Sequence, residues 1–410
     1  MKHVKLKWLV SASNAGEVID KSYWGDGDES LYTCARDILR SDFSAFPKWK
    51  RTTADDLLLT RNGTPYIHIP VEGAIYSNVV QRISVPKVDK YFLRYALEDR
   101  VRSFRGYGVS IESLNYEMWS NLEVALPDLA TQRQIADFLD RETARIDLLI
   151  EKKQRLVALL RERATSFITQ VTKHGLKGET HVDTCIDWWS RAPASWEVHR
   201  IATLFGESKE MGEEGLPVLS VSINWGISDR ELADEDRDRI VNHIEDKTAY
   251  KRVRTGDLVY NMMRAWQGAF GVAKIDGLVS PAYVVARPRK GLHSAYFEHL
   301  LRTPSCVEEF RRASKGIADF RQRLYWEHFR QVRLMLPSYE EQVEIAAYIE
   351  RKQAQSAPII SKTQDSIGRL KEYRSALITA AVTGQIDVAT YAKLGTPDRR
   401  LDAIQEEMGA

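Results

Sequence analysis

Nonpolar residues recur at alternating steps of four and three along two stretches of the chain, which is the spacing of a helix that packs against a partner helix. In the first stretch these positions are Ile146, Ile150, Lys153, Val157, Leu160, Ala164, Phe167 and Val171. The same offsets 210 residues later hold Ser356, Ile360, Thr363, Ile367, Leu370, Arg374, Leu377 and Ala381, a more polar seam that needs a packing partner. The pattern predicts two long helices that pair as an antiparallel coiled coil.

The start of each helical stretch has its own signals. Proline in each Leu-Pro pair ends an extended segment, so a helix is expected just afterwards. We predict Thr131 and Ser338 as the capping residues, each with a Gln or Glu three positions later. The first long helix is expected near residues 143–172. The second is expected to start near Ser356, with Pro358 in its first turn.

The offset of 210 residues marks an internal repeat. Residues 126–136 (LPDLATQRQIA) and 336–346 (LPSYEEQVEIA) share Leu, Pro, Gln, Ile and Ala at matched positions. Upstream, residues 56–63 resemble residues 257–268, since each is a short apolar strand that opens into a polar loop ending in glycine. A repeat this long is a duplicated half-protein and not a solenoid unit.

The repeat predicts an α+β fold with two globular domains in tandem pseudo-repeat, separated by the long helices. The expected boundaries are residues 1–128 for the first globular domain, 129–180 for the first helical region and connector, 181–337 for the second globular domain, 338–395 for the second helical region and 396–410 for a tail. A chain of 410 residues with 43% hydrophobic residues can form two or three cores.

Composition narrows the class of protein further. No segment reaches the roughly 18 apolar residues of a membrane helix, so a cytoplasmic protein without membrane association is expected. Cys34, Cys185 and Cys306 lie far apart without metal-ligand spacing and are expected to be reduced. The net charge of +2 does not by itself indicate a nucleic-acid partner.

Candidate catalytic motifs are weak. Residues 104–108 (FRGYG) match the Phe-x-Gly-x-Gly loop of adenosylmethionine-dependent methyltransferases, but they follow a charged segment, and no two prolines are adjacent as the amino-methyltransferase motif requires. A phosphate-binding loop of the Gly-x-x-x-x-Gly-Lys-Ser/Thr type is also absent from the sequence. The chain is therefore expected to be non-catalytic and to bind no metal or cofactor of its own.

Basic and amide side chains in the repeated loops favour DNA binding. Two paired helices of about 30 residues would span about 45 Å, more than one B-DNA turn of about 34 Å. Arg, Asn and Gln can pair with base edges, whereas Lys more often contacts phosphate. The predicted DNA contacts are Lys50, Arg51, Thr60, Arg61, Asn62 and Arg105 in one half, and Lys251, Arg252, Arg264, Trp266, Gln267, Lys315 and Arg321 in the other.

The Leu-Pro-x-x-x-x-Gln-x-x-Ile-Ala helix start, the long coiled continuation and the duplicated plan resemble the specificity subunit of Type I restriction-modification systems. The resemblance implies two target-recognition domains, each reading one half of a bipartite site in double-stranded DNA. It also implies helical regions that dock two methyltransferase subunits and two endonuclease or translocase subunits. S-adenosylmethionine, ATP and Mg²⁺ would belong to those partners.

An apolar stripe beside amides at both helix starts is the predicted partner surface: Gln132, Ile135, Phe138, Leu139, Gln342, Ile345, Tyr348 and Ile349. Packing within the chain is the alternative for these residues. Two other classes of protein stay open at this point. One is a self-contained DNA methyltransferase, and the other is a coiled-coil scaffold with no DNA role.

Overall fold

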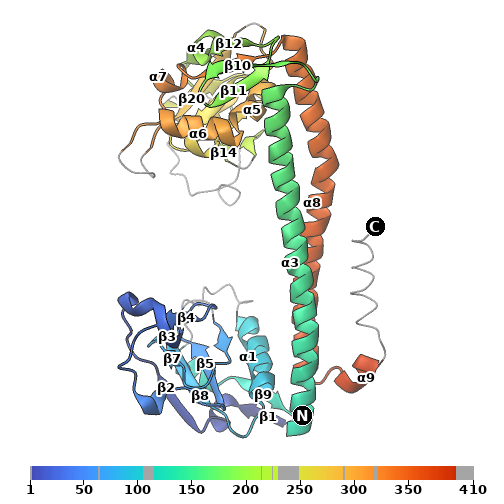
Figure 1. The fold of residues 1–410 in the computed structure, drawn as a ribbon. Coiled ribbons are helices and arrows are strands. Elements are labelled where there is room, and N and C mark those ends of the chain that lie inside the picture. The colour runs from blue at the N-terminus through green and yellow to red at the C-terminus, as the bar shows by residue number, and fades with distance from the viewer. Residues whose placement is uncertain are drawn as a thin grey trace. The chain divides into compact units, whose positions relative to one another are not determined.

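The computed structural model describes residues 2–62, 65–104, 115–213, 215–223, 225–229, 249–289, 291–316 and 322–393. The chain forms two compact units: unit 1 is Met1–Arg155 with Thr363–Ala410, and unit 2 is Leu156–Lys362. Two long helices, α3 (Leu129–His174) and α8 (Tyr339–Val382), contribute one half to each unit (Figure 1). Each unit therefore combines a globular part with two helical segments.

The globular part of unit 1 contains small sheets covered by helices. A four-stranded antiparallel sheet has the order β2-β8-β5-β6, a three-stranded sheet has the order β4-β3-β7, and β1 pairs with β9. The strands are β1 (Lys2–Lys5), β2 (Ala12–Ala15), β3 (Trp24–Tyr32), β4 (Leu39–Ser41), β5 (Asp56–Thr60), β6 (Ile67–His68), β7 (Ile75–Tyr76), β8 (Val80–Ser84) and β9 (Glu123–Leu126). The helices are η1 (Leu6–Trp8), η2 (Lys21–Tyr23), η3 (Lys48–Lys50), α1 (Lys90–Phe104), α2 (Tyr116–Ser120) and α9 (Val388–Lys393).

Unit 2 repeats this plan. Its four-stranded antiparallel sheet has the order β13-β20-β17-β18, and β12 pairs with β21 as β1 pairs with β9. The strands are β10 (His181–Ile186), β11 (Trp189–Pro193), β12 (Glu197–Arg200), β13 (Phe205–Ser208), β14 (Val221–Ser222), β15 (Gly226–Ile227), β16 (Lys251–Val253), β17 (Leu258–Asn261), β18 (Phe270–Val272), β19 (Gly277–Val279), β20 (Tyr283–Pro288) and β21 (Arg333–Leu336). The helices are α4 (Ile201–Leu204), η7 (Ala265–Gln267), α5 (Ser294–Leu301), α6 (Pro304–Ala313) and α7 (Trp326–Phe329).

The matched sheets confirm the tandem pseudo-repeat that the sequence predicts. In both units a strand near the start of the globular part pairs with the strand that leads into a long helix. In both, the strand predicted to open into a polar loop, β5 or β17, lies inside the four-stranded sheet. The chain is an α+β protein whose two halves share the order of the four-stranded sheet and the strand pair before each long helix.

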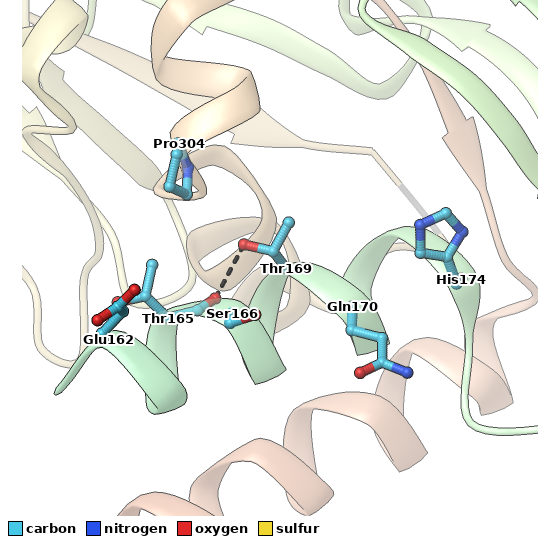
Figure 2. Close-up of a pocket in the computed structure, with 7 residues that line it drawn as sticks. All are labelled: Glu162, Thr165, Ser166, Thr169, Gln170, His174 and Pro304. Atoms are coloured by element: carbon cyan, nitrogen blue, oxygen red, sulfur yellow. Dashed lines mark hydrogen bonds between the residues drawn. The ribbon is translucent and has the colours of Figure 1, made fainter. Parts of the chain in front are cut away.

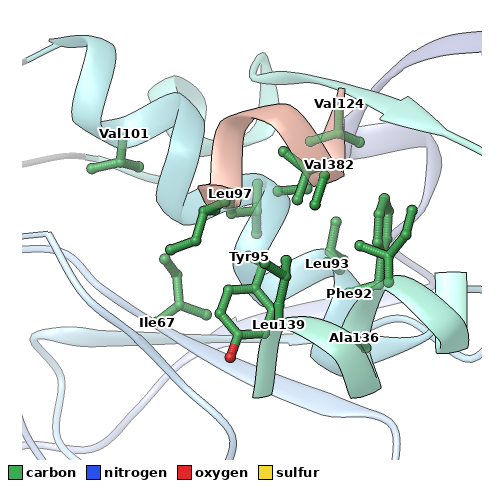
Figure 3. Close-up of a cluster of buried hydrophobic side chains, with 14 of the residues drawn as sticks. Ile67, Phe92, Leu93, Tyr95, Leu97, Val101, Val124, Ala136, Leu139 and Val382 are labelled. Carbon is green, nitrogen blue, oxygen red and sulfur yellow. The ribbon is translucent and has the colours of Figure 1, made fainter. Parts of the chain in front are cut away.

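The core of unit 1 lies where α1 meets the beginning of α3 and the end of α8. Phe92 and Leu93 of α1 are fully buried there with Leu139 of α3 and with Val382 of α8 (Figure 3). Burying each such side chain contributes about 1.5–3 kcal/mol relative to leaving it in water. The same cluster therefore fixes the helical segments to the globular part of this unit.

The predicted seam faces inward along both helices. Ile146 and Lys153 of α3 are buried in unit 1 together with Leu370 of α8, and Phe167 of α3 contacts Tyr348 of α8 in unit 2 with ring centroids 5.4 Å apart. The beginning of α3 thus meets the end of α8 in one unit, and the end of α3 meets the beginning of α8 in the other. This arrangement confirms antiparallel pairing.

Arg374 shows how the polar seam of α8 is accommodated in unit 1. Its Nε donates to Asp147 Oδ1 at 2.9 Å, and its Nη1 donates to Glu98 Oε1 at 3.0 Å. The guanidinium therefore joins α8 to both α3 and α1. A polar seam position is stable here because its charge is paired with carboxylates on two neighbouring helices.

The predicted helix bounds are wrong in two places. Helix α3 is continuous from Leu129, because Asp128 accepts from the backbone N–H of Thr131 at 3.0 Å and acts as the cap in place of Thr131. Helix α8 does not restart near Ser356; Pro358 lies inside it. The backbone carbonyl that Pro358 leaves without its helical partner lies in an exposed part of the helix, where water can bind it. Ser338 does cap α8, since its Oγ accepts from Glu341 N at 3.3 Å.

The connector after α3 is more ordered than the sequence suggests. Strands β10 and β11 form an antiparallel hairpin, and Trp189 is fully buried with its Nε1 donating to Lys173 O at 3.3 Å. Lys173 in turn donates to Trp188 O at 3.1 Å. The hairpin therefore caps the last turn of α3.

Two further expectations concern membrane spans and thiols. Within the described ranges, no helix has the length and apolar character needed to cross a bilayer. Cys34, Cys185 and Cys306 are free thiols, as predicted, and only Cys306 is buried.

Candidate DNA-recognition interface

The predicted reading loop of unit 1 follows β5. Thr60 is buried, its Oγ1 accepts from Tyr66 N at 2.8 Å, and its carbonyl accepts from Trp119 Nε1 at 3.1 Å. The prediction that Thr60 contacts DNA is therefore wrong, because its side chain closes the loop from inside. Arg61 and Asn62 lie at the surface, and Arg61 Nη1 reaches Asn78 O at 3.4 Å.

The corresponding loop of unit 2 follows β17 and contains η7. Asn261 Oδ1 accepts from Met263 N at 3.0 Å, and Gly268 ends η7 with φ +92°, a left-handed conformation that favours glycine. Trp266 Nε1 donates to Met263 O at 2.9 Å. Arg264 and Trp266 are half-buried and Gln267 is exposed, so the loop presents arginine, indole and amide groups at the surface.

A basic segment lies against this loop. The Arg311 guanidinium of α6 lies over the Trp266 ring, 5.6 Å from its centroid, and Leu324 N donates to Met262 O at 2.9 Å. Lys315 and Arg323 exchange two backbone hydrogen bonds of 3.0 and 2.9 Å, which hold their two exposed side chains beside each other. The fold thus brings the predicted residues Arg264, Trp266 and Lys315 onto one described surface.

Sequence reasoning did not select Arg311 or Arg323 as contacts. The available signal was the basic run downstream of the strand region, which continues in the sequence as far as Arg333. Of the other predicted contacts, Arg105 and Arg321 lie outside the residues that the structure describes.

Lys50 and Arg51 of unit 1 are engaged by other groups of the chain. Lys50 Nζ is 2.5 Å from Glu17 Oε1. Arg51 binds both carboxylate oxygens of Glu29 at 2.8 and 2.7 Å and donates to Gly73 O at 2.6 Å. These hydrogen bonds lower the pKa of the Glu29 carboxyl. Both cations are thus engaged within the chain, and the DNA contacts of Lys50 and Arg51 stay predictions.

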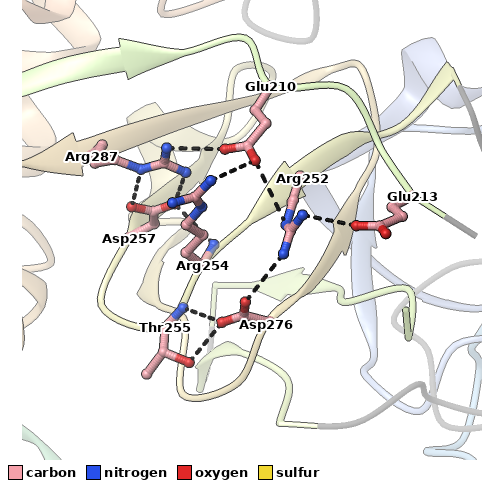
Figure 4. Close-up of polar contacts among 8 residues, drawn as sticks. All are labelled: Glu210, Glu213, Arg252, Arg254, Thr255, Asp257, Asp276 and Arg287. Atoms are coloured by element: carbon pink, nitrogen blue, oxygen red, sulfur yellow. Dashed lines mark hydrogen bonds and ion pairs between the residues drawn. The ribbon is translucent and has the colours of Figure 1, made fainter. Parts of the chain in front are cut away.

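Lys251 and Arg252 of unit 2 are engaged in the same way. Lys251 Nζ donates to Tyr283 O at 2.7 Å. Arg252 Nη1 donates to Glu213 at 2.8 Å, and its other nitrogens lie 3.8 Å from Glu210 and Asp276 (Figure 4). The DNA contacts of Lys251 and Arg252 likewise stay predictions.

Arg287 extends this network. Its guanidinium binds both oxygens of Asp257 at 3.0 and 2.9 Å, and these hydrogen bonds raise the pKa of Arg287 (Figure 4). Glu210 joins Arg287 to Arg254, at 3.0 and 2.8 Å. The network ties β16 and β20 to Asp257, the residue before β17, which is a structural role.

A second internal register explains why these basic pairs recur. Adding 201 to Lys50, Arg51 and Asp56 gives Lys251, Arg252 and Asp257. In both copies the buried aspartate accepts from the backbone N–H three residues before it, at 2.6 Å in unit 1 and 3.0 Å in unit 2. The recurrence therefore reflects a shared structural element before β5 and β17, and it is not evidence for DNA contact.

The predicted partner stripe in unit 1 faces the core. Gln132, Ile135, Phe138 and Leu139 are all buried. Gln132 Oε1 accepts from Asp89 N at 2.9 Å, and its Nε2 donates to Pro127 O at 2.8 Å. The stripe is therefore not available to a partner here, and the alternative of packing within the chain is correct.

Unit 2 repeats that arrangement. Gln342, Ile345 and Ile349 are buried, while Tyr348 is half-buried against Phe167. Gln342 Oε1 accepts from His293 N at 2.9 Å, and its Nε2 donates to Pro337 O at 3.0 Å. The two glutamines make equivalent hydrogen bonds, which explains why Gln recurs in the helix-start motif.

Other possible sites are limited. A groove of about 710 Å³ in unit 2 lies between α3 and the start of α6 and is lined by Glu162, Thr165, Ser166, Thr169, Gln170, His174 and Pro304 (Figure 2). Burial lowers the pKa of His174. Among the described residues, no cluster of three His, Cys, Asp or Glu side chains is arranged to hold a metal ion. Most of the methyltransferase-like segment 104–108 lies outside the described residues.

These features define an α+β protein with two globular parts. Each part contains a four-stranded sheet with a surface loop, and the two long helices pair antiparallel. Residues 3–158 match the family model of the Type I restriction modification DNA specificity domain. The chain is 22% identical over 382 residues to the Type I restriction enzyme EcoBI specificity subunit of Escherichia coli, covering 86% of this chain and 79% of that protein. The chain is therefore similar to the specificity subunits of Type I restriction-modification systems, through a family model over its first part and one relative over most of its length.

The fold agrees with that similarity. A chain in a solved structure concerned with complex assembly and conformational transition of the type I R-M system aligns with a TM-score of 0.59. The alignment covers 93% of this chain and 97% of that chain at 17% identity. At this identity the likeness concerns the fold alone.

Proposed function

We propose that this chain is the DNA-recognition subunit of a Type I restriction-modification enzyme, and that each globular part reads one half of a bipartite, asymmetric site. The observation that carries the proposal is one topology repeated twice with different loops after the equivalent strands β5 and β17. One loop offers Arg61 and Asn62, and the other offers Arg264 and Gln267. Different side chains on equivalent loops would read different bases.

The surface of unit 2 separates two kinds of contact. Arg264 and Gln267 belong to the short loop after β17, and arginine and amide groups can form paired hydrogen bonds to guanine or adenine edges. Lys315, Arg311 and Arg323 lie on the neighbouring basic segment, where side chains of this type neutralise phosphates and fix the register without reading sequence.

The test is binding of the assembled complex to duplexes in which one half-site at a time is altered. Changing Arg264 to Ala should lower discrimination at one half-site by about 1–3 kcal/mol and leave the other unchanged. Lys315→Ala is the matched control, since it should weaken binding to all duplexes and reduce the salt slope by about one. Equal loss of discrimination at both half-sites with Arg264→Ala would contradict the assignment.

The proposal includes two methyltransferase subunits, one per copy of the repeat, and two endonuclease or translocase subunits in the full enzyme. The helix-start stripe is buried, so docking is assigned to the outward side of the paired helices, where Leu148 is 52% exposed in unit 1 and Leu159 is 51% exposed in unit 2. S-adenosylmethionine, ATP and Mg²⁺ are assigned to those partners, and this chain is assigned no catalytic step.

Native mass spectrometry of the saturated complex tests the docking assignment. Two methyltransferase subunits per chain are expected from the duplication, and Leu159→Asp should remove one of them by placing a charge in a nonpolar contact. The control is Gln154→Ala, which changes an exposed polar residue of α3 and should leave both methyltransferase subunits bound. One partner per wild-type chain at saturation would overturn the assignment.

A further inference from the structure

We propose that Trp225, at the turn between β14 and β15, is a further DNA-contacting residue of unit 2 that packs its indole against the nonpolar surface of a DNA groove. The inference rests on the proposed function and adds a contact that carries no charge. Trp225 is 58% exposed, although it belongs to a hairpin whose strands are buried.

The hairpin that carries Trp225 is bound by Arg302, the residue that follows α5. Arg302 Nη2 donates to Ile223 O at 2.9 Å, and its Nη1 lies 3.3 Å from Glu298 Oε1. Gly226 has φ +82°, and a Cβ at this position would lie 2.5 Å from Glu298 Oε1. This left-handed conformation favours glycine, so a larger residue after Trp225 would strain the backbone there.

The same hairpin is also pressed onto β18. A Cβ on Gly271 would overlap the backbone nitrogen of Ile227, so the two strands approach more closely than any side chain on Gly271 allows. Val272 N donates to Glu298 Oε2 at 2.9 Å, which ties β18 to the helix that supports the hairpin. The turn is therefore attached to β18 and α5 and does not rely on its own two short strands.

This attachment places Trp225 next to the predicted reading loop. Strand β18 begins at Phe270, directly after the η7 loop that carries Arg264 and Gln267. Both the loop and the hairpin are thus fixed to one strand. Because β18 lies at the edge of the four-stranded sheet, the two elements border the same part of unit 2.

The chemistry of an exposed, rigidly supported indole fits a contact with DNA here. Tryptophan buries a large rigid surface at little entropic cost and is enriched among the residues that dominate binding energy. Nonpolar side chains contact thymine methyl groups in the major groove or enter the minor groove between base steps. The arginines and lysine nearby supply the ionic contacts, so the indole adds affinity that does not depend on counterion release.

The salt dependence of binding separates this role from a phosphate contact. The probe is a duplex that carries the sequence methylated in the host, bound by the complex of this chain with its methyltransferase subunits. Trp225→Ala should weaken binding about tenfold at every salt concentration, with an unchanged slope of log affinity against log salt. Trp225→Phe should restore most of the affinity, because the aromatic face is retained.

Trp8→Ala is the matched control, since Trp8 is 75% exposed but lies in unit 1 on η1. It should bind the duplex like the wild type. Wild-type affinity of Trp225→Ala, with Arg264→Ala still losing one half-site, would overturn the inference and leave the proposed function intact. Loss of a methyltransferase subunit from the Trp225→Ala complex would also overturn it, by assigning the surface to a protein. If the wild-type complex does not bind the duplex that carries the sequence methylated in the host, the proposed function itself is wrong.

Discussion

At the scale of single residues, Gln132 and Gln342 explain the most recognisable part of the sequence motif. Each side chain is buried, and both polar groups of its amide form hydrogen bonds. The oxygen accepts from a backbone N–H at the start of a neighbouring element, and the nitrogen donates to a proline carbonyl. Buried polar groups left without such partners are costly. The motif is therefore a structural joint between a globular part and a long helix.

Replacing either glutamine with alanine should lower the free energy of unfolding by about 1–3 kcal/mol, because a buried N–H and a buried carbonyl lose their partners. Chemical denaturation followed by circular dichroism measures the change. Gln134→Ala is the control, since Gln134 is exposed on the same helix turn and should have almost no effect. If Gln132→Ala lowers the free energy of unfolding no more than Gln134→Ala does, Gln132 does not hold the helix to the globular part.

His68 predicts a pH dependence. Burial lowers the pKa of His68 to about 4, against an ordinary value near 6.5. The unfolded chain therefore takes up a proton first as the pH falls, so stability is fully present above about 6.5 and is lost between about 6.5 and 4. The loss is up to about 3 kcal/mol.

Thermal unfolding of wild type and His68→Gln between pH 7 and pH 4.5 should show this dependence. The wild type should lose stability more steeply than the variant over that range, whatever the absolute stability of the variant. His3→Gln, which changes an exposed histidine, should follow the wild type. Parallel curves for wild type and His68→Gln would show that His68 does not titrate in this way.

At the scale of elements, the sequence predicts periodicity well and capping less well. The steps of four and three locate the buried seam correctly, because burial on one face of a helix imposes that spacing. The predicted helix starts at Thr131 and Ser356 are wrong. A Thr or Ser near a proline resembles an N-terminal capping residue even where the helix begins earlier in the chain. Asp128 provides the cap in α3, and α8 continues through Pro358 in an exposed stretch where water can bind the freed carbonyl.

Contact residues are harder to predict than elements. Lys50 and Arg252 are basic and recur in both halves, as a DNA surface would, yet their carboxylate partners Glu17 and Glu213 lie 33 and 39 residues away in sequence. Only the fold shows that these charges are paired. Trp225 is not predicted from the sequence, because the close approach of Gly226 and Gly271 to other elements, which supports its hairpin, is seen only in the fold.

The paired helices lead to a prediction about spacing. Helix α3 has 46 residues and α8 has 44, so each spans roughly 65–70 Å at 1.5 Å per residue. Inserting four residues after Leu160 and four after Ile360 keeps both seams nearly in register and adds about 6 Å. The nonspecific spacer of the DNA site should then grow by about one or two base pairs.

Sequencing of methylated bases in the host DNA measures that spacer. An insertion in α3 alone is the control, because it breaks the register with α8 and should reduce methylation at every spacing. Full methylation at the original spacing with the matched insertion would mean that the helices do not set the distance between the half-sites.

At the scale of the whole molecule, the duplication is the feature that favours a reader of two half-sites. Two sheets of one topology, two helix joints of one geometry and two different surface loops are what a reader of an asymmetric bipartite site requires. A self-contained methyltransferase has no need of the second copy. A scaffold without a DNA role has no need of the surface that brings Arg264, Arg311 and Lys315 together.

The most direct measurement is a map of methylated positions in host DNA with the wild-type chain and with the double variant Arg264→Ala, Gln267→Ala. The wild type should give two short defined sequences separated by a fixed nonspecific spacer. The variant should keep the half read by unit 1 and relax only the other. A single uninterrupted site, or relaxation of both halves together, would contradict the claim that each globular part reads its own half-site.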